Sequence, residues 1–301
     1  MVKVKVKVPA TSANMGAGFD CLGVALGLYN YVEAEETDNG LVIDIKDSTA
    51  DYLPGNERNL VYRSMKTLFD EVGYTAKGLH LVQKNDIPVT RGLGSSSAGI
   101  VGGLLAANEI SKADLSRDEI LAIAARIEGH PDNVAPAIMG GMTVNVTDIG
   151  KIKYVRTDVP EDLMFAAFVP EFTLSTKKAR GVLPKTVSVR DAVFNMGRSA
   201  LLMSSIMTGK YENIRAATAD KLHQRYRKKF IPNIDDVFKA AYRADALGVY
   251  LSGAGPAVVA IIKADNENFV KKMNYFVKTK INGWNMHILK PDNMGAVVCE
   301  K

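Results

Sequence analysis

The sequence predicts an α+β fold organised in two domains, on three observations. The first residues alternate apolar and charged with period two, as in a strand, whereas segments 59–72 and 95–110 carry apolar residues at helical spacing. The 301 residues exceed the length at which a single core usually stops growing, and 47% apolar residues suffice for two cores. We therefore expect domains at 1–160 and 161–301, without a low-complexity linker or an internal repeat.

Strands and helices alternate along the first half of the chain. The opening stretch from Val2 to Val8 places its valines on one face and Lys3, Lys5 and Lys7 on the other, which predicts a strand with one wet face. Further strands are expected near 30–35, 41–45 and 79–84, and helices at 59–72 and 95–110.

A further helix is predicted over 117–128. Its apolar residues recur at helical spacing from Ile120 to Ile127, and Gly129 and Pro131 end it. A strand pattern resumes at 140–146, a mixed segment follows near 151–160, and the run at 163–169 opens a second set of strands and helices.

The segment from Pro88 to Ala98 sets a glycine turn and a serine triplet directly before a predicted helix. Gly92 and Gly94 permit backbone conformations and close approaches that a β-carbon would block. Ser95 to Ser97 are expected to cap the helix, whose unpaired amides and positive dipole end then face the loop. This arrangement favours a bound anion such as phosphate.

Two commoner nucleotide motifs are excluded for this segment. A P-loop requires Lys followed by Ser or Thr after its second glycine, and a dinucleotide fingerprint requires Gly where Ser97 stands. Amides and hydroxyls would therefore hold the phosphate. Taken alone, the segment also fits an ordinary glycine-rich turn that begins a helix.

Two other segments have a similar composition. Residues 9–26 and 250–262 are rich in small residues and glycine, and each is predicted to form a loop beside an apolar element. Such loops allow backbone to come close to backbone or to a ligand.

In these three segments the chain resembles the GHMP kinases, a superfamily of small-molecule kinases, and within it the homoserine kinases. The stretches Pro9-Ala-Thr-Ser-Ala-Asn-Met-Gly-Ala-Gly-Phe-Asp20 and His130-Pro-Asp-Asn-Val-Ala-Pro136 are similar to homoserine kinases in particular, and the order and spacing of the motifs match over nearly the whole chain. The resemblance implies an N-terminal α+β domain with a left-handed crossover, a ferredoxin-like C-terminal domain, and an active site between them. It also implies phosphorylation of the L-homoserine hydroxyl by ATP, which supplies O-phospho-L-homoserine for threonine synthesis.

Such a reaction requires Mg²⁺, because phosphoryl transfer depends on alignment and on neutralising the charge of the phosphates. In the family a loop serine and a glutamate at a helix end bind the metal, and these match Ser96 and Glu128. Only Gly129 separates Glu128 from His130, whereas some homoserine kinases have several more residues there. The residues implied to bind ATP are Pro88, Val89, Thr90, Arg91, Gly92, Leu93, Gly94, Ser95, Ser96, Ser97 and Ala98.

L-Homoserine presents an ammonium, a carboxylate and a hydroxyl group. By resemblance Asp20 pairs with the ammonium, and Arg180 and Arg227 take the carboxylate, which a planar guanidinium can bind through two parallel hydrogen bonds. The other residues implied in the substrate pocket are Asn14, His130, Asn133 and Thr176, and those implied in catalysis are Asn14, Ser96 and Glu128.

Taken singly, these residues have ordinary structural interpretations. Asn14 and Asp20 fit turn positions, His130 fits a helix cap and Arg180 fits a surface charge. Together, in family order, they favour a substrate pocket.

We assign no general base. Other GHMP kinases use an aspartate paired with a lysine near the reacting hydroxyl, and no such pair is evident in this sequence. A loose, metaphosphate-like transition state makes little demand on a base. Asp20 as the base is an alternative, and near-normal turnover of Asp20→Asn with a raised homoserine KM would count against it.

Two alternative functions stay open at this point. One is another GHMP kinase acting on a mevalonate-type or sugar substrate, and the other is a non-catalytic sensor of ATP and an amino acid. The segment from Asn14 to Asp20 together with 130–133 argues against the first, and the presence of Ser96 and Glu128 argues against the second.

Composition favours a cytoplasmic enzyme. The net charge of +5 is small, and its basic residues are dispersed apart from a cluster at 225–229, so no nucleic-acid partner is expected. Cys21 and Cys299 lie far apart without metal-binding spacing, and no signal peptide or membrane span is recognised. The family resemblance implies a homodimer.

Glycines inside the helix at 95–110 predict close packing. Gly99, Gly102 and Gly103 each cost roughly 1 kcal/mol relative to alanine in a helix interior. We therefore expect another backbone element to cross there.

Overall fold

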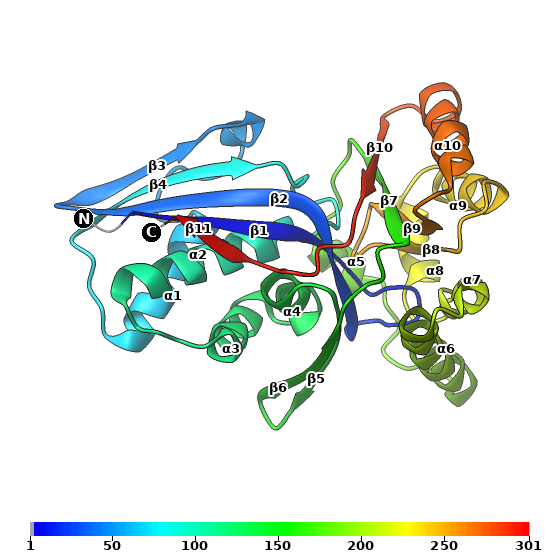
Figure 1. The fold of residues 1–301 in the computed structure, drawn as a ribbon, viewed down its shortest axis with the longest axis horizontal. Coiled ribbons are helices and arrows are strands. Elements are labelled where there is room, and N and C mark those ends of the chain that lie inside the picture. The colour runs from blue at the N-terminus through cyan, green and yellow to red at the C-terminus, as the bar shows by residue number, and fades with distance from the viewer. Residues whose placement is uncertain (1–2, 301) are drawn as a thin grey trace.

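The computed structural model describes residues 3–300 and contains two sheets, each with its own helices (Figure 1). The first sheet has the order β11-β1-β2-β4-β3. Strand β5 also pairs with β2, and β6 pairs with β5. Its strands are β1 (Lys3–Ala13), β2 (Leu22–Thr37), β3 (Gly40–Ile45), β4 (Gly78–Asn85), β5 (Met142–Asp148), β6 (Lys151–Thr157) and β11 (Val297–Glu300).

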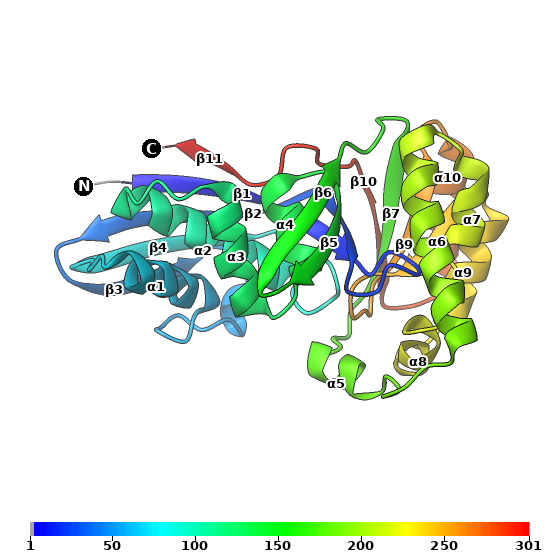
Figure 2. The same cartoon turned by 90° about the horizontal axis from the view of Figure 1, so that it is seen from below.

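Four helices cover one face of this sheet, as both ribbon views show (Figures 1 and 2). They are α1 (Leu60–Val72), α2 (Ser95–Ser111), α3 (Arg117–Glu128) and α4 (Pro131–Met139), and a 3-10 turn, η1 (Ser48–Asp51), precedes α1. Strands β3 and β4 are parallel, so α1 forms a crossover connection between them. Its left-handedness stays a prediction.

The second sheet has the order β10-β7-β9-β8 with every pair antiparallel. Numbered within this unit, the strands run 4-1-3-2 with helices after the first and third, which is the ferredoxin-like arrangement. Its strands are β7 (Leu163–Pro170), β8 (Gly248–Leu251), β9 (Val258–Lys263) and β10 (Trp284–Leu289). Its helical elements are α5 (Thr176–Gly181), α6 (Val189–Thr208), η2 (Tyr211–Asn213), α7 (Ile214–Ala217), α8 (Gln224–Arg227), η3 (Lys228–Phe230), α9 (Ile234–Arg243) and α10 (Glu267–Lys280).

The two-domain α+β architecture is therefore confirmed, with one addition. After β10 the chain returns to the first sheet, where β11 pairs antiparallel with β1. The boundary near residue 160 itself stays a prediction.

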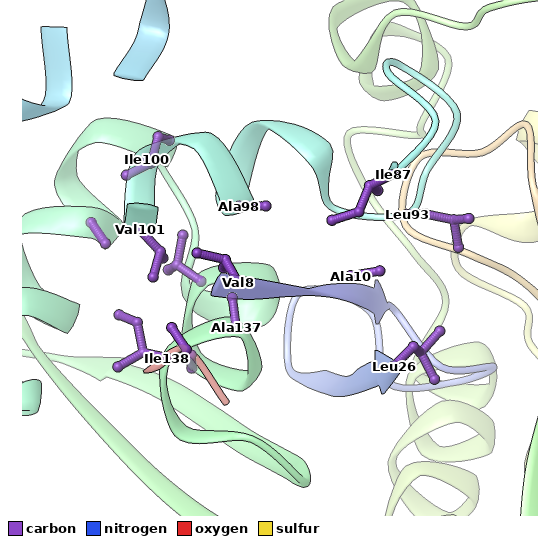
Figure 3. Packing of buried hydrophobic residues seen from close by; sticks show 14 of the residues in the cluster. Val8, Ala10, Leu26, Ile87, Leu93, Ala98, Ile100, Val101, Ala137 and Ile138 are labelled. Atoms are coloured by element: carbon purple, nitrogen blue, oxygen red, sulfur yellow. The ribbon is translucent and has the colours of Figure 1, made fainter. Parts of the chain in front are cut away.

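The core follows from the alternation in β1. Val4, Val6 and Val8 are fully buried, whereas Lys5 lies on the other face and pairs with Glu33 of β2 at 3.0 Å. This confirms the predicted strand with one wet face, except that Val2 lies outside the described residues. Figure 3 shows side chains of β1, α2 and α4 that belong to this core, among them Val8, Val101 and Ile138.

The glycines of α2 have the predicted close neighbours. A β-carbon on Gly103 would lie 2.5 Å from the carbonyl oxygen of Val61 in α1, and one on Gly102 would lie 2.8 Å from the Val32 side chain in β2. Gly99 is looser, with its nearest neighbour at 3.7 Å. The packing of α2 against α1 therefore depends on Gly103 above all.

Segment 9–26 differs from its prediction as a loop. Residues 9–13 extend β1 and residues 22–26 begin β2, so only the turn 14–21 is irregular. The small side chains serve helix packing instead, because a β-carbon on Gly23 would lie 1.9 Å from the carbonyl oxygen of Asp132 in α4. We call residues 14–21 the β1–β2 turn.

Among the elements that the sequence analysis does not predict individually are helices α4 and α6 and strand β6. Two prolines obscure α4, although Pro131 occupies the first helical position, where proline needs no amide partner. The mixed segment at 151–157 becomes strand β6 because β5 supplies its hydrogen-bond partners. Sequence pattern alone did not show that neighbour.

The predicted serine cap of α2 is wrong. The N-cap residue is Gly94, in left-handed conformation with φ of 72°, and no side chain caps the helix. Instead, Ser96 and Ser97 turn their hydroxyls toward Glu128.

None of the helices within residues 3–300 is long and apolar enough to cross a bilayer.

Candidate active site

A cavity of about 370 Å³ lies where the two units meet. All three glycine-bearing segments converge on it. The hydroxyl oxygens of Ser12 and Ser252 lie 2.7 Å apart, and Ser252 also donates to the carbonyl of Gly92 at 2.6 Å. The glycine segment after β8 therefore reaches back to the first unit, and Gly253 is fixed there because its amide donates to Ala13.

The loop before α2 forms one wall of the cavity. Because no side chain caps α2, its first amides remain available to a ligand at the positive end of the helix dipole. Of the predicted ATP-binding residues, those that line the cavity are Val89, Thr90, Gly92, Gly94, Ser95 and Ser96. Those that do not line it are Pro88, Arg91, Leu93, Ser97 and Ala98.

The Arg91 side chain is held by three hydrogen bonds within the protein. Its guanidinium donates to the backbone carbonyls of Val89, Pro170 and Glu171. The side chain thus joins the loop to the end of β7 and fixes the loop against the second unit.

Ser96 and Glu128 meet although they are 32 residues apart. The Ser96 hydroxyl donates to Glu128 Oε1 at 2.8 Å, and Ser97 donates to the same oxygen at 3.2 Å. Glu128 ends α3 beside Gly129, a left-handed C-cap with φ of 91°. A hydroxyl and a carboxylate so placed match the oxygen ligands of a magnesium ion.

The described residues contain no cluster of three or more His, Cys, Asp or Glu suited to a metal. Mg²⁺ usually binds through one or two protein oxygens, with waters and phosphate oxygens completing its shell. The predicted metal-binding pair therefore fits the ion by its donor atoms.

The β1–β2 turn carries two predicted substrate residues in left-handed conformation, Asn14 with φ of 62° and Asp20 with φ of 53°. Asn14 is nearly buried; its amide oxygen accepts from the backbone N–H of Asp20 at 2.8 Å, and its amide nitrogen donates to Gly253 at 2.8 Å. Asn14 thus shapes the turn that presents Asp20.

Asp20 and Arg180 pair with each other. Arg180 Nη1 and Nη2 donate to the two carboxylate oxygens at 2.9 and 2.7 Å. The pair joins the first unit to α5, and both side chains remain about one-third exposed, at 34% for Asp20 and 36% for Arg180. The sequence indicated both residues but not this mutual contact.

Arg227 is a buried cation in the cavity wall, only 1% exposed. It donates to the carbonyls of Ala179 and Gly253 at 3.2 and 3.0 Å, and no carboxylate within residues 3–300 forms an ion pair with it. Burial, together with the charge of Arg180, lowers its pKa to about 10. Within this geometry an anionic ligand would offset its charge.

His130 and Asn133 lie at the start of α4. His130 Nδ1 donates to Asp132 at 2.6 Å; burial lowers the pKa of His130, but this hydrogen bond and the charge of Asp132 outweigh burial and raise it overall. Asn133 accepts from the hydroxyl of Thr11 at 2.9 Å. Both residues line the cavity.

Thr176 also lines the cavity, at the first position of α5 after the capping Ser175. Every predicted substrate residue except Asp20 therefore lies in the cavity wall. Asp20 reaches the cavity only through its contact with Arg180.

The sequence prediction missed part of the cavity wall outside the predicted loop. The one available signal was Asn59, which caps α1 by accepting from Val61 at 2.9 Å and also accepts from Gln83 at 3.0 Å. The missed lining residues in this part of the wall are Leu53, Pro54, Arg58, Asn59, Leu60, Val61, Gln83 and Asn85. Asp132 and Leu174 were missed elsewhere in the wall.

Two family models match the chain. The N-terminal domain of the GHMP kinases matches residues 59–141, and the C-terminal region of the GHMP kinases matches residues 202–279.

Curated relatives extend the match over nearly the whole chain. A homoserine kinase of Caldicellulosiruptor bescii is 48% identical over 297 residues, covering 98% of this chain and 96% of the relative. A homoserine kinase of Clostridium botulinum (strain Okra / Type B1) is 46% identical over 295 residues, covering 98% of each.

Solved structures agree. The homoserine kinase from Cytophaga hutchinsonii has a TM-score of 0.89 and 29% identity, covering 98% of this chain and 97% of that one. The mevalonate kinase from L. major has a TM-score of 0.70 at 15% identity, over 95% of this chain and 96% of that one, which shows a shared fold alone.

Proposed function

The chain belongs to the homoserine kinase family of the GHMP kinases, and we propose that it transfers the γ-phosphoryl group of ATP to the hydroxyl oxygen of L-homoserine, which yields O-phospho-L-homoserine and ADP. One observation carries the proposal. The same cavity holds the Ser96–Glu128 pair beside uncapped helix amides and, on another part of its wall, a buried Arg227 without a carboxylate partner.

At the phosphate end, Ser96 and Glu128 would hold Mg²⁺ through one hydroxyl and one carboxylate oxygen. Bound there, the ion would neutralise negative charge on the phosphates and help to align them. The α2 amides add hydrogen-bond donors at the positive end of the helix dipole. Arg91 would keep these donors in place, because it ties the loop to β7.

At the acceptor end, the charges match a zwitterionic amino acid. An incoming ammonium group would pair with Asp20, and an incoming carboxylate would bind Arg227 and Arg180, so the amino acid replaces the Asp20–Arg180 contact with two of its own. The carboxylate also compensates the buried charge of Arg227. Mevalonate and sugars carry no ammonium group for Asp20.

We assign no residue to remove the hydroxyl proton. Asp20 is assigned to the ammonium group of the acceptor, so its carboxylate is engaged there and not at the reacting hydroxyl. A loose transition state can develop before the proton leaves.

We also infer a homodimer, supported by an unusual outward face on α6. Val189, Val193, Met196 and Met207 are 81%, 57%, 63% and 58% exposed and share one side of this helix. Large exposed apolar residues in one stripe favour a helix–helix contact between two copies of the chain. Light scattering of the purified protein and of Met196→Glu tests this inference.

A cytoplasmic location is proposed as well, since both cysteines are free in a chain that brings no disulfide together.

The test of the reaction is ADP release with MgATP and a panel of L-homoserine, L-serine, mevalonate, galactose and shikimate. Selective turnover of L-homoserine, with O-phospho-L-homoserine identified by phosphorus NMR, is the expected result. Turnover of mevalonate or a sugar would overturn the acceptor assignment. Binding of ATP and L-homoserine without ADP release would favour a sensor instead.

A further inference from the structure

His223 is a fully buried histidine that neither the family resemblance nor the cavity lining singles out. It precedes α8 as its N-cap residue, yet its side chain does not cap that helix. Its ring stacks on Phe19 of the β1–β2 turn, with centroids 5.3 Å apart and planes inclined by 25°. Such burial of a polar ring requires partners for both nitrogens.

Both nitrogens have partners, and these fix the tautomer. The ring Nε2 lies 2.8 Å from the carbonyl oxygen of Gly16, and Nδ1 lies 3.2 Å from Arg227 Nη1. A carbonyl only accepts and a guanidinium only donates. His223 is therefore neutral, with its proton on Nε2 and an unprotonated Nδ1 that accepts from Arg227.

The surrounding charges agree with a neutral ring. Burial lowers the pKa of His223, and Arg227 of α8 lowers it further, whereas Asp220 before α8 and Asp20 of the β1–β2 turn oppose the shift. Protonation would direct an Nδ1–H toward the Arg227 guanidinium. The ring thus acts as an acceptor for that cation only while it remains neutral.

His223 closes a ring of hydrogen bonds around the acceptor end of the cavity. Arg227 Nη1 donates both to His223 and to the carbonyl of Gly253, and Asn14 donates to that same carbonyl. Gly16, which His223 holds, is two residues after Asn14 in the β1–β2 turn. The circuit therefore runs from Asn14 through Gly253, Arg227 and His223 back to the turn.

The β1–β2 turn is tightly packed around Gly16. A β-carbon on Gly16 would lie 2.5 Å from the α-carbon of Thr218, so this segment already packs backbone against backbone. Asn195 of α6 donates to the Ala17 carbonyl at 3.2 Å and to Asp220 at 2.7 Å, which anchors the loop before His223 to the same turn.

We propose that His223 is a positioning residue for the amino-acid acceptor: it holds the guanidinium of Arg227 and the β1–β2 turn that carries Asp20 in a fixed mutual geometry. The inference rests on the proposed function. His223 does not touch the substrate; it sets the separation between the group that meets the carboxylate and the group that meets the ammonium. ATP binding, at the α2 end of the cavity, is independent of it.

Two conservative variants separate the two contacts. In His223→Gln the amide nitrogen can replace Nε2 and donate to Gly16, but the acceptor for Arg227 is lost. In His223→Asn the amide oxygen can replace Nδ1 and accept from Arg227, but it does not reach Gly16. His287→Gln is the matched control, since His287 is a partly buried histidine on β10 outside the cavity.

The measurements are kcat and the KM values for L-homoserine and MgATP. His223→Gln is expected to raise the homoserine KM about tenfold through loss of the charge-assisted hydrogen bond from Arg227, and His223→Asn about fivefold through loss of the neutral hydrogen bond to Gly16. The MgATP KM and kcat of both variants should stay within about twofold of wild type. A double-mutant cycle with Arg227→Lys is expected to be strongly non-additive for His223→Gln. An unchanged homoserine KM in folded variants would overturn the proposal, as would equal losses for both substrates.

A measurement on the unmodified chain keeps the proposal testable if the variants do not fold. Nitrogen NMR of histidine-labelled protein should show an Nε2-protonated His223 whose Nδ1 resonance shifts on addition of L-homoserine and not of MgATP. A protonated ring, or an Nδ1 resonance indifferent to L-homoserine, would refute the positioning role. Absence of homoserine turnover in wild type would instead refute the proposed function, so the two failures are distinguishable.

Discussion

The two ends of the cavity are built in different ways. At the phosphate end the loop before α2 is one continuous segment, residues 89–96, and Glu128 joins it from the end of α3. The acceptor end is assembled from the β1–β2 turn, α4, α5 and α8, so its groups meet only when both units are folded together. The loop residues of the phosphate end are adjacent in sequence, whereas the residues of the acceptor end are brought together by the tertiary structure.

Their charges also differ. At the phosphate end the α2 amides carry no side-chain cap and are left for a ligand. At the acceptor end Asp20 and Arg180 satisfy each other, whereas Arg227 contacts carbonyl groups, a histidine nitrogen and the ring of Phe19. The contrast indicates that the acceptor substrate must displace the Asp20–Arg180 contact and also compensate the buried charge of Arg227. We therefore expect the acceptor end to determine which alcohol is phosphorylated and the phosphate end to determine kcat.

Breaking the phosphate end should give the largest effect. Glu128→Gln or Ser96→Ala is expected to lower kcat by about a hundredfold to a thousandfold, because each removes a ligand to the metal that stabilises charge in the transition state. The dissociation constant of L-homoserine, measured by calorimetry, should stay within about twofold. The exposed Glu161→Gln serves as control. A kcat near wild type for Glu128→Gln would contradict its assignment.

The two arginines should differ in their effects. Arg227→Lys is expected to lower kcat/KM for L-homoserine about a hundredfold, since a buried guanidinium that forms several hydrogen bonds is lost. Arg180→Lys should cost about tenfold, because this side chain is 36% exposed and an ammonium can still pair with Asp20. Steady-state kinetics with both variants checks the order, and the reverse order would show that Arg180 is the main carboxylate ligand.

Asp20→Asn sharpens the comparison within the acceptor end. We expect the homoserine KM to rise about tenfold with near-normal kcat, because the change removes the partner of the ammonium but no reacting group. Asn266→Ala, which removes a helix cap far from the cavity, controls for general destabilisation. A large loss of kcat at saturating L-homoserine would instead identify Asp20 as a base.

Packing of α2 should affect folding before it affects chemistry. Gly103→Val places a β-carbon 2.5 Å from the Val61 carbonyl oxygen, and we expect a loss of about 1–3 kcal/mol in unfolding free energy. Gly99→Ala, with its nearest contact at 3.7 Å, should be neutral or stabilising. Thermal unfolding compares the two variants. Equal stability would mean that α1 and α2 can shift apart freely.

The smallest expected effect is on the pH dependence of stability. His223 has a pKa below the ordinary 6.5, with burial as the main cause, so between its two pKa values the unfolded chain binds a proton that the folded chain does not. Its contribution to the unfolding free energy therefore falls as pH drops below 6.5. Urea unfolding on both sides of this pH should show a steeper decline in wild type than in His223→Gln. Parallel declines would mean that the ring is not held neutral.

The phosphate end is predictable from sequence for a physical reason. Gly92, Gly94 and the serines are adjacent, and the helix that follows is periodic, so local chemistry suffices to indicate an anion site. The error there is also local. The serines were expected to cap α2, but a left-handed Gly94 takes the N-cap position and frees the hydroxyls for Glu128.

The acceptor end could be anticipated only through family resemblance. Nothing in the spacing of Asp20, Arg180 and Arg227 shows that two of them pair and the third is buried. His223 was missed because a lone histidine in a basic stretch gives no sign of its partners. Strand β6 and helix α4 were missed for the same reason, since their stability comes from neighbours distant in sequence.

The most direct test of the account compares L-homoserine with two analogues that each lack one charge. The analogue 4-hydroxybutyrate retains the hydroxyl and the carboxylate, and 3-aminopropan-1-ol retains the hydroxyl and the ammonium. Phosphorylation of L-homoserine with kcat/KM at least about a hundredfold above either analogue is the predicted result, because each analogue lacks either the ammonium that meets Asp20 or the carboxylate that meets Arg227. Comparable phosphorylation of all three alcohols would contradict recognition of a zwitterion at this site.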